Sequence, residues 1–209
     1  MYKKYLAEFI GTFALTFIVL RMAVEGSGLS VFVALVASVT LGLFVYTIGS
    51  ISGCHINPAI TLGQLLIRKI SFKNAGFYII VQFLGALAAW YVSNLFGVSQ
   101  YYSLHLPVRG MFELQAFLAE MLGAFFFAFG IASVVYGKAK EQMSGFVVGG
   151  SLLFGAVVAT LSGAIGILNP AVAAALLNTN ISLTILYITA PIVGAVLGFQ
   201  VYKFMVDGQ

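Results

Sequence analysis

The tripeptide Asn-Pro-Ala occurs twice in this chain, as Asn57-Pro58-Ala59 and as Asn169-Pro170-Ala171. Each copy has the pattern of a helix start, because asparagine can accept from unpaired N–H groups of the first turn and proline has no N–H to lose at the next position. The apolar stretch from Asn57 to Ile67 would make a helix of roughly 16 Å, about half of a ~30 Å hydrocarbon core. We therefore expect a half-length helix that reaches only to the middle of a membrane.

The two copies lie 112 residues apart, and a second motif recurs at the same spacing. The stretch Leu6 to Phe13 reads Leu-Ala-Glu-Phe-Ile-Gly-Thr-Phe, and Leu118 to Phe125 reads Leu-Ala-Glu-Met-Leu-Gly-Ala-Phe. One Asn-Pro-Ala could occur by chance at a helix start of a soluble protein. Chance does not explain two different motifs that recur at the same spacing. The chain is therefore predicted to be a tandem repeat within a single domain, 1–209, with repeats at about 1–98 and 112–209.

The composition places this repeat in a membrane. Hydrophobic residues make up 61% of the chain, charged residues 8%, and the mean hydropathy is +1.07. An ordinary soluble domain would carry about 25% charged residues. Six apolar stretches approach or exceed the ~20 residues that span a bilayer: 5–24, 31–50, 74–97, 112–136, 143–163 and 183–205. The predicted fold is an all-α integral membrane protein with six transmembrane helices and two re-entrant half-helices.

Each repeat holds three spans, an odd number, so the two repeats must insert in opposite directions. In such inverted repeats the half-helices enter from opposite sides and their N-termini meet near the midplane. Most basic residues fall on one side, which the positive-inside rule makes cytoplasmic: Lys3, Lys4, Arg68, Lys69, Lys73, Lys138, Lys140 and Lys203, against Arg21 and Arg109. We expect both termini to be cytoplasmic, in a plasma or inner membrane. The net charge of +4 comes from basic residues at the ends of the apolar stretches, where membrane topology accounts for them. We therefore expect no nucleic-acid partner.

Two carboxylates, Glu8 and Glu120, lie at equivalent positions inside apolar stretches. An intramembrane acid suggests a proton relay, but one acid per repeat could equally accept from the unpaired backbone N–H groups of each re-entrant loop. We favour loop support, because no intramembrane Lys, Arg or His is placed as a relay partner. His55, beside Cys54, is expected to line the inner vestibule or support its loop. No catalytic set converges, so no enzyme, cofactor or metal site is expected.

The meeting point of the half-helices suits a neutral solute. Each helix N-terminus presents about half a positive charge, and the side-chain amides of Asn57 and Asn169 can both donate toward a lumen. A cation at ~5 Å would be repelled by roughly 1.7 kcal/mol per helix end at an effective dielectric of 20. A conducting pore for uncharged molecules follows.

These motifs resemble those of the aquaporin, or major intrinsic protein, family over essentially the whole chain. The resemblance rests on Ala7 to Thr12, on Ser52 to Gly63 and on Asn169-Pro170-Ala171. It implies a homotetramer in the lipid bilayer, with one pore per subunit and passive flow of water, glycerol or similar neutral solutes.

One position departs from the family pattern. The resemblance implies an arginine directly after the second Asn-Pro-Ala, in the narrowest outer part of the pore, but this chain has Val172. Carrying over the other filter positions by distance from each asparagine gives Ala37, Val157 and Gly166. All four residues are small or apolar, so the filter is expected to be unusually wide. Such a filter favours larger neutral solutes such as glycerol and urea beside water. The chain resembles in this respect the family members with valine at the arginine position, and this resemblance implies uncharged or methylated metalloid compounds as further solutes.

Two other functions remain open. An inverted-repeat secondary transporter would share the broken helices but need a coupling-ion site, for which only Glu8 and Glu120 are available. A non-conducting structural membrane protein would use the same fold with its pore closed.

Overall fold

The computed structural model describes residues 2–24, 31–97, 111–177 and 181–207, and their regular structure is helical. Six helices are long and apolar enough to cross a membrane: α1 (Tyr2–Val24), α2 (Val31–Ser52), α4 (Phe72–Leu95), α5 (Met111–Val135), α6 (Ser144–Leu161) and α8 (Ile181–Val206). Two short helices, α3 (Pro58–Leu66) and α7 (Pro170–Leu176), follow the Asn-Pro-Ala asparagines, and a 3-10 turn, η1 (Glu141–Met143), precedes α6. The predicted all-α membrane architecture is confirmed.

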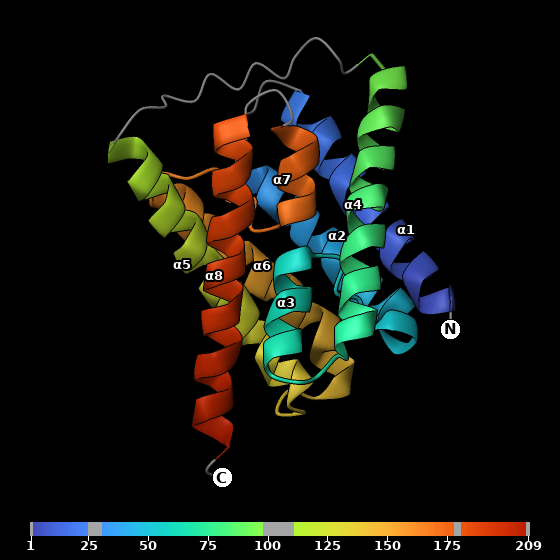
Figure 1. Cartoon of the computed structure of the whole chain (residues 1–209), viewed down its shortest axis with the longest axis vertical. Helices are drawn as coiled ribbons and strands as arrows, with labels where there is room; N and C mark the ends of the chain where they lie inside the picture. Colours follow the sequence, from blue (N-terminus) through green and yellow to red (C-terminus); the bar gives the residue numbers. More distant parts are fainter. Residues whose placement is uncertain (1, 25–30, 98–110, 178–180, 208–209) are drawn as a thin grey trace.

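The short helices lie end to end in the middle of the molecule, and the long helices surround them (Figure 1). Both halves have the same order of elements, long, long, short, long. Packing repeats as well, since α1 packs on α4 in the first half and α5 packs on α8 in the second, while α2 and α6 join the halves. Both ends of the chain lie in the lower half of this view.

Glycines allow the closest helix crossings. A Cβ on Gly85 of α4 would meet the carbonyl oxygen of Phe9 on α1, and one on Gly194 of α8 would collide with the carbonyl oxygen of Met121 on α5. The obstacle in both cases is backbone, which cannot move as a flexible side chain can. Small residues at such crossings let apolar helices pack where lipid supplies no hydrophobic driving force.

Replacing Gly194 with alanine is therefore expected to separate α5 from α8 and to cost roughly 1–3 kcal/mol, the usual range for overpacking. Gly150 provides the control, because an added Cβ there would meet nothing within 4 Å. In thermal unfolding of the detergent-purified protein, Gly194→Ala should lower the Tm while Gly150→Ala leaves it unchanged or raises it. Equal Tm values for the two variants would contradict the close crossing.

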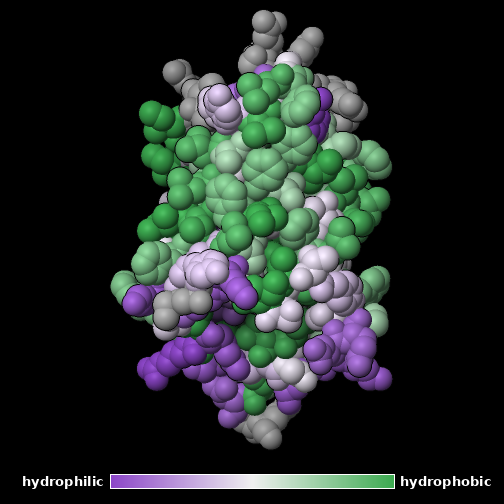
Figure 2. Space-filling view, turned by 90° about the vertical axis from the view of Figure 1, so that its right-hand side faces the viewer, coloured by the Kyte–Doolittle hydropathy of each residue, from purple (hydrophilic) through white to green (hydrophobic). Residues whose placement is uncertain are grey.

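The outer surface is that of a membrane protein. Viewed from the side of α1 and α4, a broad hydrophobic band covers the molecule and hydrophilic residues gather below it (Figure 2). Buried polar side chains include Glu8, Glu120, Asn57 and Asn169, each at most 3% exposed. These four residues meet at the two re-entrant loops.

Candidate functional site

Both short helices begin with the same cap. The side-chain oxygen of Asn57 accepts from the backbone N–H of Ala59 at 2.8 Å, and that of Asn169 accepts from Ala171 at 3.0 Å. Both asparagines are in extended conformation, and a proline occupies the first turn of each helix. Each cap satisfies one N–H that the helix itself cannot pair.

The two loops are also tied to each other. The amide nitrogen of Asn57 donates to the carbonyl of Leu168 at 2.9 Å, and that of Asn169 donates to the carbonyl of Ile56 at 3.0 Å. Ile56 and Leu168 occupy equivalent repeat positions and both have positive φ, 39° and 52°, a strained conformation for side chains of this kind. The reciprocal hydrogen bonds compensate this strain and hold the helix ends face to face.

This tie changes the role expected for the asparagines. The sequence suggested that both amides donate toward the lumen, but one N–H of each amide is used across the loops. Each NH₂ group has two donors, and the second donor has no protein partner within the described residues. Of the two N–H groups of each amide, one therefore holds the opposite loop.

Glu8 supports the first loop with four hydrogen bonds and is fully buried. Its carboxylate accepts from the backbone N–H groups of His55 at 2.9 Å and Ile56 at 2.6 Å. The Ser52 hydroxyl at 2.7 Å and the Gln82 amide at 2.8 Å complete the set. Because these four donors come from the loop, α2 and α4, Glu8 holds the loop before Asn57 in place.

Glu120 supports the second loop in the same way. It accepts from the backbone N–H groups of Gly166, Ile167 and Leu168, the last two at 2.9 Å. Ile167 and Leu168 are the repeat equivalents of the two residues whose N–H groups bond Glu8. No side chain in the described residues adds to this set, so the second carboxylate has backbone partners alone.

Two tyrosines that the sequence analysis missed anchor the loop entrances. The Tyr78 hydroxyl on α4 donates to the carbonyl of Ser52 at 2.7 Å, and the Tyr187 hydroxyl on α8 accepts from the N–H of Ile165 at 3.0 Å. Both tyrosines are at least 97% buried. Gln82 was missed as well. For Gln82 the available signal was an amide side chain between apolar neighbours, from Ile79 to Leu84.

His55 lies in the first loop, 6% exposed, and borders the lumen. Its Nδ1 is 3.2 Å from the Thr61 hydroxyl, and its ring packs edge-on against Tyr78 with centroids 5.2 Å apart. Cys54 is 5% exposed, and its backbone N–H donates to the Ser52 hydroxyl at 3.1 Å. These contacts place His55 between the loop, α3 and the lumen.

A cavity of about 40 Å³ is lined by both asparagines, by the two loops and by residues of α1, α2, α5, α6 and α7. At roughly 10–15 Å³ per water position, it has room for about three water molecules. Three of the four positions carried over as filter positions line it, namely Ala37, Gly166 and Val172. The other lining residues are Leu15, Val19, Val33, Ala34, Leu41, His55, Ile56, Asn57, Phe127, Leu152, Ala156, Thr160, Ile165, Ile167 and Asn169.

Val157 is not among the residues that line this cavity, and its assignment to the filter stays a prediction. Leu152, Ala156 and Thr160 present the lining face of α6. Residues four apart lie on one face of a helix, whereas Val157 is rotated about 100° from Ala156. The position was counted back from Asn169 through a loop, and such a count does not fix the helix face.

The lumen is mostly apolar, with few polar groups. The Thr160 hydroxyl donates to its own helix at the Ala156 carbonyl, 2.8 Å away, so its proton is occupied. Gly166 has only backbone to offer, and within the described residues no donor reaches its carbonyl or that of Ile167. The arrangement can therefore accept from a solute at backbone oxygens and donate to it from Asn57 and Asn169.

Tyr187 gives a test of how the outer loop is held. In Tyr187→Phe the ring volume is kept, but the Ile165 N–H loses its acceptor, at a cost of ~1–3 kcal/mol. Because Ile165 precedes Gly166 at the lumen, we expect the ratio of glycerol to water permeability to change. Tyr78→Phe, at the opposite loop entrance, is the matched control and should leave this ratio nearer the wild-type value. Identical ratios in all three proteins would contradict a positioning role for Tyr187.

Comparison with known proteins identifies the family. The family model described as Major intrinsic protein matches residues 1–207. Aquaporin Z of Rhodopseudomonas palustris is 34% identical over 97% of this chain and 92% of its own length. Glycerol uptake facilitator protein-like 6 of Lactiplantibacillus plantarum is 35% identical over 93% of this chain and 94% of its own length. The X-ray structure of the aquaglyceroporin from Plasmodium falciparum shares the fold, with a TM-score of 0.76 at 21% identity and 99% coverage of both chains. The chain belongs to the major intrinsic protein family.

Proposed function

We propose that this protein is a passive channel for water and small neutral solutes. The observation that carries this proposal is the cavity of about 40 Å³ at the meeting point of two helix N-termini. Asn57 and Asn169 both line it, and one N–H of each amide has no partner among the described residues. A solute with lone pairs can accept there and donate to backbone carbonyls. The names of the relatives, an aquaporin and a glycerol uptake facilitator, support the same class of function.

Electrostatics disfavour cations at this point. Two facing helix ends together oppose a monovalent cation by roughly 3 kcal/mol at ~5 Å and an effective dielectric of 20. Removing the water shell of an ion costs more in a wall with few polar groups. Neutral molecules meet neither cost.

The solute range extends beyond water in this proposal. Val172 is 3% exposed and lines the cavity with Ala37 and Gly166, so neither a positive charge nor an aromatic ring comes from these positions. An outer constriction built from such side chains is wide and apolar. Glycerol, urea, and uncharged or methylated metalloid compounds are the solutes that it suits.

The contacts of the two carboxylates argue against an ion-coupled transporter. Glu8 faces four donors and Glu120 three, and all of these contacts come from neutral groups of the protein. Such a carboxylate is an occupied acceptor, poorly placed to exchange a coupling ion. A non-conducting scaffold would have no need for a lumen lined by free amide donors.

Assembly and orientation belong to the same proposal. We propose a homotetramer with one pore per subunit and both termini in the cytoplasm of a plasma or inner membrane. The basic residues grouped at one end support the orientation; of the two that oppose it, Arg21 is described and Arg109 lies outside the described residues. The exposed apolar surface supports burial in lipid and between subunits.

Solute-driven swelling of proteoliposomes tests the proposal. Water, glycerol and urea should each enter faster than into protein-free liposomes, because one lumen serves all three. The range proposed for the filter would be contradicted if water alone entered faster. A rate equal to that of empty liposomes for every solute would overturn the channel itself.

A further inference from the structure

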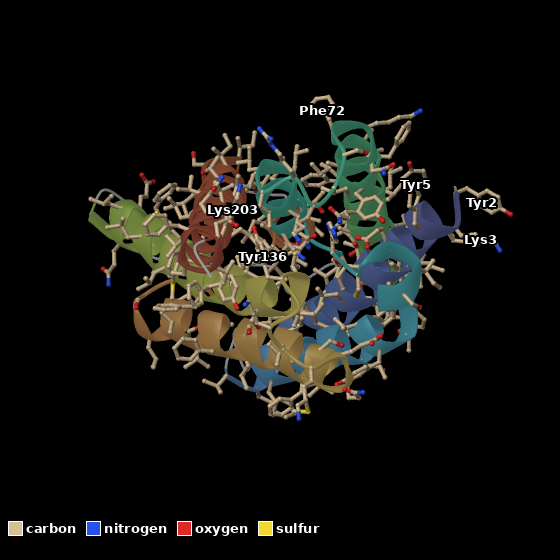
Figure 3. All side chains as sticks on the ribbon, turned by 90° about the horizontal axis from the view of Figure 1, so that it is seen from below. Tyr2, Lys3, Tyr5, Phe72, Tyr136 and Lys203 are labelled. Carbon is tan, nitrogen blue, oxygen red and sulfur yellow. The ribbon has the colours of Figure 1, made fainter. Side chains whose placement is uncertain are left out.

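Thr160 is the polar side chain that α6 contributes to the lumen. Among the described residues that line the cavity, the polar side chains are those of His55, Asn57, Asn169 and Thr160. The first three belong to the two re-entrant loops, whereas Thr160 comes from the last turn of α6. Seen from below, α2 and α6 form one side of the molecule and α4 and α8 lie toward the other (Figure 3). The side chains that α2 and α6 otherwise present to the cavity are apolar, so Thr160 is the polar group of this wall.

The proton of the Thr160 hydroxyl is already used. Its Oγ1 donates to the carbonyl of Ala156 at 2.8 Å, and the carbonyl oxygen of Ile165 is further away at 3.4 Å. A threonine in a helix can bond the carbonyl four residues back, and this bond fixes the rotamer of its side chain. A hydroxyl has one donor and two acceptor lone pairs. Thr160 therefore meets a solute as an acceptor.

The hydroxyl oxygen of Thr160 is open to the lumen. Thr160 is partly exposed, whereas His55, Asn57 and Asn169 are at most 6% exposed. No donor in the part of the chain that the structure describes bonds to Oγ1. Gly166 lies against the hydroxyl with a φ of 78°, and a Cβ there would come within 2.8 Å of Oγ1. A side chain at this position would cover the oxygen, and glycine leaves it uncovered.

The lumen thus presents donors and an acceptor from different elements. The amides of Asn57 and Asn169 are donors at the meeting point of the half-helices, and the Thr160 oxygen is an acceptor on α6. Ala37 and Val172 line the same cavity with apolar side chains. A polyol matches such a lining, because each of its hydroxyl groups can both donate and accept and its carbon atoms carry apolar C–H groups.

We infer that Thr160 determines the preference of the lumen for polyols over water. This inference rests on the proposed channel function and names the residue that selects among its solutes. A polyol that fills the lumen loses its water shell, so each of its hydroxyl groups needs a new partner, and a missing partner is costly. The oxygen of Thr160 accepts from one of them. Water depends less on this acceptor, since a cavity with room for about three water molecules lets them bond to each other.

Two substitutions separate hydrogen bonding from size. Thr160→Val keeps the branched shape but removes the hydroxyl, whereas Thr160→Ser keeps the hydroxyl on a smaller side chain. Thr160→Val should lower the ratio of glycerol to water permeability by roughly threefold to tenfold, the effect of one lost hydrogen bond, and Thr160→Ser should stay within about twofold of wild type. A role in size alone predicts the reverse, with a wild-type ratio in Thr160→Val and faster glycerol entry in Thr160→Ser. That result would overturn the inference.

Thr40 provides the matched control. Its hydroxyl on α2 donates to the carbonyl of Val36, four residues back, at 2.8 Å, which is the same bond that Thr160 makes. Thr40 is not among the residues that line the cavity. Thr40→Val therefore removes an equivalent hydroxyl away from the lumen and should keep the wild-type ratio. An equal fall in both valine variants would show an indirect effect of the helix and contradict the inference.

The measurement is the initial rate of glycerol entry and of water flow in proteoliposomes that hold equal amounts of each full-length protein. If Thr160→Val does not assemble, Thr160→Ala decides, because it widens the lumen and lacks the hydroxyl: slower glycerol entry supports the inference and faster entry overturns it. A wild type that conducts glycerol, with the same ratio in Thr160→Val, would refute the role of Thr160 alone. A wild type no faster than protein-free liposomes would overturn the channel and this inference together.

Discussion

Replacing Glu120 with alanine is expected to give, together with Glu8→Ala, the largest loss of stability among single changes at the pore. Three backbone N–H groups, from Gly166, Ile167 and Leu168, would lose their acceptor. An unpaired buried donor costs ~1–3 kcal/mol, so roughly 3 kcal/mol or more is at stake. The measurement is the Tm of the purified protein, with solute flux in proteoliposomes as a second readout. Glu8→Ala should behave alike, since it leaves four donors unpaired.

Two further variants distinguish loop support by Glu120 from proton transfer through it. Glu120→Gln keeps one acceptor oxygen and should fall between wild type and Glu120→Ala. Glu113→Ala, at an exposed position near the start of the same helix, should change little. A Glu120→Gln protein with wild-type Tm and no solute uptake would instead support the proton-coupled transporter.

The second large effect concerns the filter. Val172→Arg should lower glycerol permeability strongly and water permeability least, because the side chain narrows a constriction formed with Ala37 and Gly166. The new charge would oppose a cation at ~5 Å by about 3 kcal/mol at an effective dielectric of 20, similar to both helix ends combined. Any proton or cation leak should therefore fall. Swelling assays with water, glycerol and urea, beside a pH-sensitive dye, measure both effects.

Val172→Met separates size from charge. Methionine narrows the lumen without a charge, so it should reduce glycerol flow but leave any cation leak unchanged. Equal glycerol flow in wild type and Val172→Arg would place the constriction elsewhere and refute the assignment of Val172 to the filter.

The sequence predicted the fold well because its strongest signals are physical constraints on a membrane chain. Few arrangements satisfy the span lengths, the odd number of spans per repeat and the two capped half-helices together. The structure has the predicted order of long and short helices. Glu8 and Glu120 could be found because a charge in an apolar stretch needs a partner. Glu8 is the one acid in its stretch, and Glu120 lies well inside a stretch whose other acid, Glu113, is at its start. In both cases the re-entrant loop can supply the donors.

The pore lining was harder to predict. Val157 was assigned by counting through a loop, and an error of one residue rotates a side chain by about 100° on a helix. Leu15 and Phe127 line the lumen at equivalent repeat positions, but nothing distinguishes them from lipid-facing residues in an apolar helix. The bonds from Asn57 to Leu168 and from Asn169 to Ile56 depend on positive φ at two apolar residues, which no sequence pattern indicates.

The central claim is passive flow through the lumen between the paired asparagines. The most direct measurement is the initial rate of glycerol entry into proteoliposomes at several glycerol gradients, with and without ionophores that collapse proton and sodium gradients. A channel predicts rates proportional to the glycerol gradient, unchanged by the ionophores and lowered in Asn57→Ala and Asn169→Ala. Accumulation of glycerol against its gradient, or loss of entry when the ion gradients collapse, would contradict it.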